Sequence, residues 1–159
     1  MTTLSAYDEI TLEYGGNAVF LRPSLLAAIR LERLHDGFPA LLRKIDEFDT
    51  RTVRSVITYS TDRAAADTLL THTATQPLSR FKQAAQVPMF DLVAALMPQS
   101  PEGQDQTESA GTPMPWSEVY RELFKLATGW LNWTPETAWN ATPQEITDAF
   151  SAHIAKLKA

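Results

Sequence analysis

The residue types that most often catalyse reactions or bind metals are sparse and scattered in this sequence. The histidines His35, His72 and His153 lie far apart, and none is four residues from another, the spacing that a helical zinc site uses. Cysteine is absent, which excludes thiolate metal sites, iron–sulfur clusters and cysteine nucleophiles. No phosphate-binding glycine loop or nucleophile elbow occurs. We therefore predict a protein that is not an enzyme and holds no cofactor or metal.

Two local groups of residues remain as candidates for ligand chemistry. Asp46, Glu47 and Asp49 form a small acidic cluster, which is usually the solvated end of a helix; one bound Mg²⁺ ion is the alternative. Gly15 and Gly16 are adjacent, as in loops that cradle phosphate. They lead into a predicted strand rather than a helix, so a hairpin turn is the better interpretation.

Aromatic side chains are concentrated near the C-terminus. All four tryptophans fall within residues 116–159. A segment this short buries little of its own surface, so its rings must be covered either by residues 1–97 or by another protein. The candidate partner-binding residues are Trp116, Tyr120, Trp130, Trp133, Trp139 and Phe150.

Residues 1–97 are predicted to form a hairpin followed by a helical domain. Apolar residues alternate on both sides of the Gly-Gly-Asn run at residues 15–17, which predicts a β-hairpin. Apolar residues then recur at helical spacing, and we expect Thr50 to cap the third helix. Pro88 is expected to separate two short helices, and Pro98 to end the second.

Residues 98–115 differ in kind from the residues before them. They are rich in proline, contain Glu102, Asp105 and Glu108 but no basic residue, and have one large apolar side chain, Met114. Such a stretch cannot bury enough apolar surface to offset the entropy of ordering it. We predict a flexible acidic linker between a domain of residues 1–97 and a tryptophan-rich helical segment of residues 116–159.

The C-terminal segment carries the clearest helix signals. Ser117 is expected to cap its first helix, with Trp130 on that helix's apolar face. Thr134 and Thr142 each precede a proline, and Thr142 forms a capping box with Glu145. The last helix places on one face Ile146, Ala149, Phe150, His153, Ile154 and Leu157. The predicted fold class is mainly α, with a small N-terminal β-hairpin, a helical bundle, a linker and a short C-terminal helical segment.

The charge of the chain limits its partners. The formal net charge is −5 and the isoelectric point is near 5.1, and no basic patch is visible, so we expect no binding to nucleic acid or anionic membranes. The N-terminus lacks a secretory signal pattern, and no apolar run approaches the roughly 20 residues that span a bilayer. We expect a cytoplasmic protein that binds other proteins or further copies of itself.

A specific pattern runs through residues 116–145. A tryptophan opens a helix, a glycine lies near its end, a hydrophobic–proline turn follows, and then the run W-x-x-T-P-x-E. The residues that carry the pattern are Trp116, Gly129, Pro135, Trp139, Thr142, Pro143 and Glu145. In these features the segment resembles the small phage tail assembly chaperones.

Residues 10–60 carry a second resemblance. A strand, a glycine turn at Gly15-Gly16, the run Leu21-Arg22-Pro23 before a helix, and Glu32 followed shortly by a glycine are arranged as in tail proteins of gene-transfer-agent particles. Those proteins are also classed with tail assembly chaperones. The two parts are expected more often as separate short proteins, so their combination in one chain departs from the family pattern.

The two resemblances imply a non-enzymatic tail assembly chaperone of a phage or prophage. Such a protein binds the long, coiled-coil-rich tape measure protein in the bacterial host cytoplasm and keeps it soluble. It leaves when tail tube subunits, a further expected partner, polymerise around its client, so it is not expected in the mature virion. The alternatives are a structural minor tail or connector component of the virion, a helix-turn-helix DNA-binding regulator, which the acidic charge disfavours, and an enzyme without a local signature.

Overall fold

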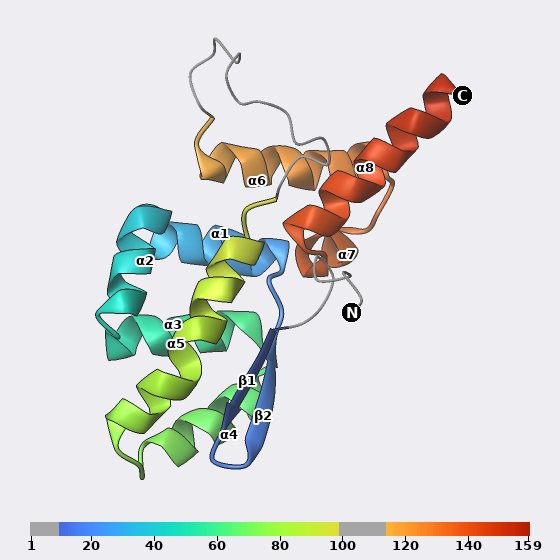
Figure 1. Cartoon of the computed structure of the whole chain (residues 1–159). Coiled ribbons are helices and arrows are strands. Elements are labelled where there is room, and N and C mark those ends of the chain that lie inside the picture. The colour runs from blue at the N-terminus through green and yellow to red at the C-terminus, as the bar shows by residue number, and fades with distance from the viewer. Residues whose placement is uncertain (1–9, 99–113) are drawn as a thin grey trace.

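The computed structural model describes residues 10–98 and 114–159. These residues are mainly helical and begin with a two-stranded hairpin, which confirms the predicted fold class (Figure 1). The predicted linker lies outside the described residues between residues 99 and 113, so it stays a prediction.

The hairpin lies where the sequence predicts it. β1 (Ile10–Tyr14) and β2 (Asn17–Leu21) pair in antiparallel register. Gly15 and Gly16 form the turn with φ angles of 60° and 81°, a conformation that glycine adopts more readily than other residues. Alternate side chains point to the core, and those that are buried are Leu12, Val19 and Leu21.

A run of helices follows the hairpin, and most begin at a side-chain cap. Asp49, not Thr50, caps the third of them, because its carboxylate accepts a hydrogen bond from the Thr52 N–H at 3.0 Å. Asp62 caps a separate fourth helix in the same way. The bounds are α1 (Leu25–Leu34), α2 (Phe38–Asp46), α3 (Thr50–Ser60), α4 (Arg63–Thr73) and α5 (Leu78–Ala95).

The prediction that Pro88 separates two helices is wrong. α5 is continuous, with Pro88 inside it. Residues on both sides of Pro88, including Ala85 and Met89, are buried in the same hydrophobic cluster. This shared burial stabilises one helix across a residue that lacks an N–H and usually breaks helices.

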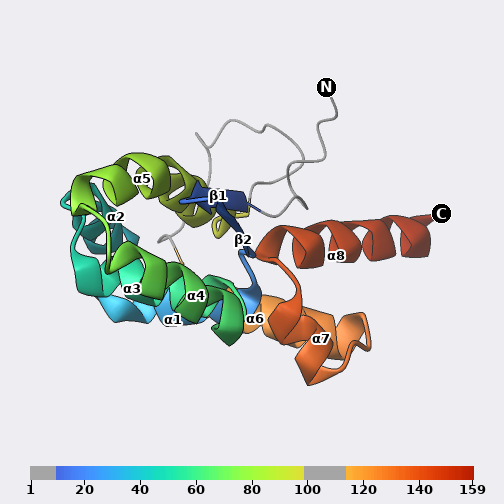
Figure 2. The ribbon, with the colours of Figure 1, turned by 90° about the horizontal axis from the view of Figure 1, so that it is seen from below.

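The C-terminal helices are α6 (Trp116–Lys125), the π-helical turn η2 (Leu126–Trp130), α7 (Pro135–Asn140) and α8 (Pro143–Lys158). Thr134 and Thr142 cap α7 and α8, and Thr142 forms the predicted capping box with Glu145. Ser117 is not a cap, because α6 begins one residue earlier, after Pro115. The far half of α8 extends away from the other helices (Figures 1 and 2).

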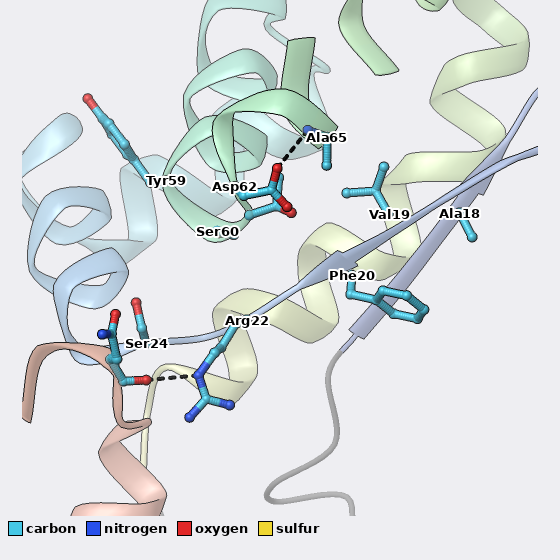
Figure 3. A pocket seen from close by; sticks show the side chains of 11 residues that line it. Ala18, Val19, Phe20, Arg22, Ser24, Tyr59, Ser60, Asp62 and Ala65 are labelled. Carbon is cyan, nitrogen blue, oxygen red and sulfur yellow. Dashed lines mark hydrogen bonds between the residues drawn. The ribbon is translucent and has the colours of Figure 1, made fainter. Parts of the chain in front are cut away.

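Arg22, at the end of the hairpin, forms hydrogen bonds that link the C-terminal helices to the N-terminal part of the chain (Figure 3). Its Nε donates to the Asn140 carbonyl at 2.8 Å. Its Nη2 donates to the Glu145 carboxylate at 3.0 and 3.2 Å. The Leu25 N–H donates to the Ala141 carbonyl at 2.7 Å nearby. The segment between α7 and α8 is therefore held against the start of α1.

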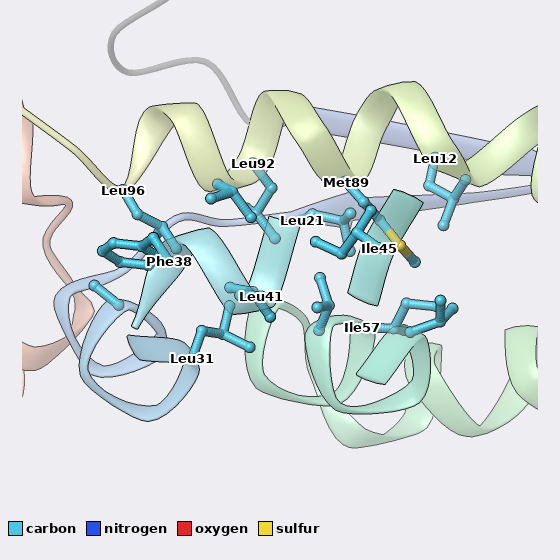
Figure 4. Close-up of a cluster of buried hydrophobic side chains, with 14 of the residues drawn as sticks. Leu12, Leu21, Leu31, Phe38, Leu41, Ile45, Ile57, Met89, Leu92 and Leu96 are labelled. Atoms are coloured by element: carbon cyan, nitrogen blue, oxygen red, sulfur yellow. The ribbon is translucent and has the colours of Figure 1, made fainter. Parts of the chain in front are cut away.

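A single hydrophobic cluster joins elements from both parts of the chain. Its centre lies between α5 and the helices α1, α2 and α3 (Figure 4). The fully buried side chains there include Leu31, Leu41, Ile45, Ile57, Met89 and Leu92. Residues 116–146 add further members, among them Tyr120 and Ile146, so these helices share the core of residues 10–97.

Tyr120 closes the contact between α6 and the first helices. It is fully buried, and its hydroxyl donates to the Leu96 carbonyl at 2.7 Å. The Phe38 ring packs edge-on at 6.3 Å between centroids, and the Trp116 ring stacks at 5.8 Å. Burial, with a smaller effect of the nearby Glu32 charge, raises the pKa of Tyr120 far above its ordinary value of 10.0.

The hairpin turn gives a first prediction, because a Cβ atom at Gly15 would overlap the His72 ring while one at Gly16 would meet nothing. Gly16→Ala should lower the free energy of unfolding by about 1–2 kcal/mol through its left-handed backbone alone. Gly15→Ala should cost about 1–3 kcal/mol more through the overlap. Chemical denaturation measures both penalties. When the same two substitutions are made in a His72→Ala protein, their penalties should become equal, because the ring that a Cβ atom at Gly15 would overlap is gone. Equal penalties in the presence of His72 would contradict this packing.

Tyr120→Phe should lower the free energy of unfolding by about 1–2 kcal/mol near pH 7, because the Leu96 carbonyl loses its donor. The raised pKa means that this stabilisation is complete below pH 10.0, the ordinary tyrosine value, and declines above it as the unfolded phenol ionises. Denaturation curves on both sides of that pH should therefore show the difference between the two proteins shrinking. The matched control is Tyr59→Phe, whose ring lies beside Arg30 and is not buried in the core; it should change the free energy of unfolding by less than about 0.5 kcal/mol near pH 7.

Candidate functional site

The far half of α8 presents an apolar face that the described residues do not cover. The first turn is anchored, since Thr142, Pro143 and Ile146 are buried. Beyond Phe150 every residue of the helix is half-buried or exposed. Phe150, Ile154 and Leu157 follow one another at helical spacing on one side, and Leu157 is 61% exposed.

Trp130 extends this face from the neighbouring turn. Its ring centroid lies 6.5 Å from that of Phe150 and 6.2 Å from that of His153, edge-on in both cases, and the side chain remains 56% exposed. A hollow of about 660 Å³ adjoins Trp130 and His153. We call this surface the Trp130 patch, and it comprises Trp130, Phe150, His153, Ile154 and Leu157.

The other predicted partner-binding residues lie elsewhere. Tyr120 is buried and out of reach of a partner. Trp116 stacks on Tyr120, and Trp139 stacks on Phe124 with 4.3 Å between centroids. Trp116, Trp133 and Trp139 are partly buried and pack against the core. Two of the six candidates, Trp130 and Phe150, therefore lie together in the Trp130 patch, while Trp116 and Tyr120 meet at the core.

The exposure of Trp130 follows from the η2 turn. The sequence places Trp130 on the buried face of an α-helix, but the chain widens there, and the Leu131 N–H donates to the carbonyl of Leu126, five residues back. The Trp133 N–H then donates to the Ala127 carbonyl, and Asn132 adopts a positive φ of 55°. Trp130 is thereby turned toward α8. Ile154 and Leu157 were not candidates, although their spacing from Phe150 could have indicated them.

A second cleft, of about 480 Å³, lies between β2, the start of α1 and the α3–α4 turn (Figure 3). Its charged groups are engaged within the protein: Arg22 binds Glu145, and Asp62 caps α4. The buried Ser60 hydroxyl, which lines the cleft, has no hydrogen-bond partner among the described residues. A Ser hydroxyl without a neighbouring base is not an activated nucleophile.

His35, His72 and Asp49 have structural roles. His35 bonds the Thr52 hydroxyl at 2.7 Å, and His72 packs on the hairpin turn. Asp49 caps α3, and hydrogen bonds from Thr52 hold the pKa of its carboxyl below the usual value. Within residues 10–98 and 114–159 no three potential metal ligands gather closely enough to hold an ion.

None of the helices in the described part of the chain combines the length and apolar character needed to cross a membrane.

Comparisons with known proteins add no family to this description. No family model matches the chain, and no curated protein or solved structure has significant similarity to it.

Proposed function

We propose that this chain is a tail assembly chaperone of a phage or prophage, acting in the host cytoplasm without enzymatic activity. Its client is the tape measure protein, which it keeps soluble until tail tube subunits replace it. The observation that carries the proposal is the Trp130 patch, an apolar surface on a helix that extends away from the body of the protein. The resemblance of residues 116–145 to the small phage tail assembly chaperones supports the choice of this client.

The chemistry of the patch suits a helical client. Apolar residues at positions i, i+4 and i+7, here Phe150, Ile154 and Leu157, form the stripe with which one amphipathic helix packs on another. A tape measure protein rich in coiled coil offers complementary apolar stripes along its length. Trp130 widens the stripe with a large ring, and tryptophan often contributes strongly to binding energy at interfaces.

The small extent of the patch suits temporary binding. It is formed by one helix and the adjoining turn, and its rim carries the exposed ion pair of Lys125 and Glu122 at 3.2 Å. Small interfaces with polar rims are typical of complexes that form and dissociate readily. Tube subunits that polymerise around the client can therefore displace the chaperone.

Trp130→Ala should weaken client binding without unfolding the protein. The test is co-expression of the full chain with the tape measure protein encoded near it, followed by affinity pull-down and a solubility assay. Because the ring is 56% exposed, its loss should leave the melting temperature nearly unchanged. Its loss as an interface anchor should cost about 2 kcal/mol or more of binding free energy. Leu157→Ala should act in the same direction.

Phe20→Ala is the matched control, because Phe20 is an aromatic residue with 55% exposure on the hairpin. It should bind the client like the unmodified chain. The proposal fails if the client stays insoluble and does not co-purify, or if Phe20→Ala weakens binding as much as Trp130→Ala. Stoichiometric amounts of this protein in finished particles would favour the structural minor tail component instead.

A further inference from the structure

Helices α1, α6 and α7 lie next to one another (Figure 2). Side chains from all three line a cleft of about 280 Å³. Its apolar lining comes from Leu26 and Ile29 on α1 and from Trp139 on α7, all of them half-buried. The remaining lining residues are polar or charged: Arg30, Glu32, Arg33, Ser117 and Arg121. The cleft therefore combines an apolar lining with three guanidinium groups and one carboxylate.

Among the residues that the structure describes, no acidic side chain forms an ion pair with the arginines of this cleft. Arg30, Arg33 and Arg121 are exposed, and none of them takes part in an ion pair within the described residues. Arg30 lies over the Tyr59 ring, 5.5 Å from its centroid. This local excess of positive charge contrasts with the formal net charge of −5 of the whole chain. Unpaired arginines around an apolar cleft are suited to meet carboxylates supplied from outside.

We propose that this cleft binds an acidic segment of a partner protein, in which an apolar side chain is flanked by carboxylates. The apolar side chain would pack on Trp139, Leu26 and Ile29, and the carboxylates would pair with Arg33 and Arg121. Guanidinium groups bind carboxylates through two parallel hydrogen bonds, and tryptophan and arginine are the residues most enriched at binding hot spots.

A protein segment fits the cleft better than a nucleic acid does. The apolar lining has no counterpart in a phosphate backbone, which carries a charge at every nucleotide. The acidic charge of the chain also opposes a long polyanion. A short segment that brings few carboxylates and one apolar anchor satisfies both parts of the lining.

This inference does not rest on the tail assembly proposal. The hollow beside the Trp130 patch and the arginine-lined cleft share no residue. The two sites can therefore be tested separately, and Trp130→Ala should leave binding at the cleft unchanged.

The experiment measures fluorescence anisotropy of a labelled peptide that repeats the triplet Glu-Glu-Leu, titrated with the full chain. The control peptide repeats Gln-Gln-Leu and has the same apolar side chains. The test variant is Arg33→Gln with Arg121→Gln; both side chains are exposed, so folding is preserved. The control variant is Arg80→Gln with Lys82→Gln, which removes the same charge from exposed positions on α5.

We expect the unmodified chain to bind the acidic peptide more tightly than the glutamine peptide, with an affinity that falls as salt is added. The test variant should bind about tenfold more weakly or worse, because it loses two charge-assisted contacts to the carboxylates of the peptide. The control variant should bind within about twofold of the unmodified chain. The proposal is overturned if neither peptide binds, if both bind equally, or if the two variants lose affinity equally. Tighter binding of labelled oligothymidylate through the same arginines would also overturn it.

Discussion

The arrangement of the C-terminal helices depends on the burial of Tyr120. This side chain fills the junction between α6 and the first helices, and its hydroxyl satisfies the Leu96 carbonyl at the end of α5. A buried carbonyl without a donor would be costly, and a phenol is both large enough to fill the space and able to donate. Because α6 is fixed in this way, the η2 turn and the start of α8 are fixed as well.

Arg22 provides a second attachment, between the hairpin and the segment that joins α7 to α8. Glu145 serves two purposes, since one carboxylate closes the capping box of α8 and also receives the Arg22 guanidinium. The pair is only partly exposed and is made through both carboxylate oxygens, which distinguishes it from the freely solvated ion pairs of the surface. The base of α8 is thus rigid, and the apolar face beyond it has a defined direction.

Local interactions explain what the sequence could predict. The hairpin turn and the caps at Thr134 and Thr142 depend on residues within a few positions of each other, and these predictions are confirmed. The continuity of α5 through Pro88 and the outward turn of Trp130 depend on packing between distant elements and on a π-helical turn, which periodicity does not indicate. For the same reason sequence patterns indicate Trp130, Phe150 and Tyr120 alike as candidates, and they do not show that Tyr120 is buried in the core while Trp130 is exposed.

Apart from the contact of Phe150 and His153 with the Trp130 ring, the far half of α8 has little of the tertiary packing that stabilises most helices in proteins. The sequence compensates with local interactions at both ends of this helix. The capping box at Thr142 provides hydrogen-bond acceptors for N–H groups at the start of the helix. Lys156 and Lys158 lie in the last turn, where positive charge interacts favourably with the negative end of the helix dipole. A helix stabilised in this manner can keep Leu157 exposed and Ile154 only half-buried, and large apolar residues gathered on one accessible face are typical of a surface that binds another protein.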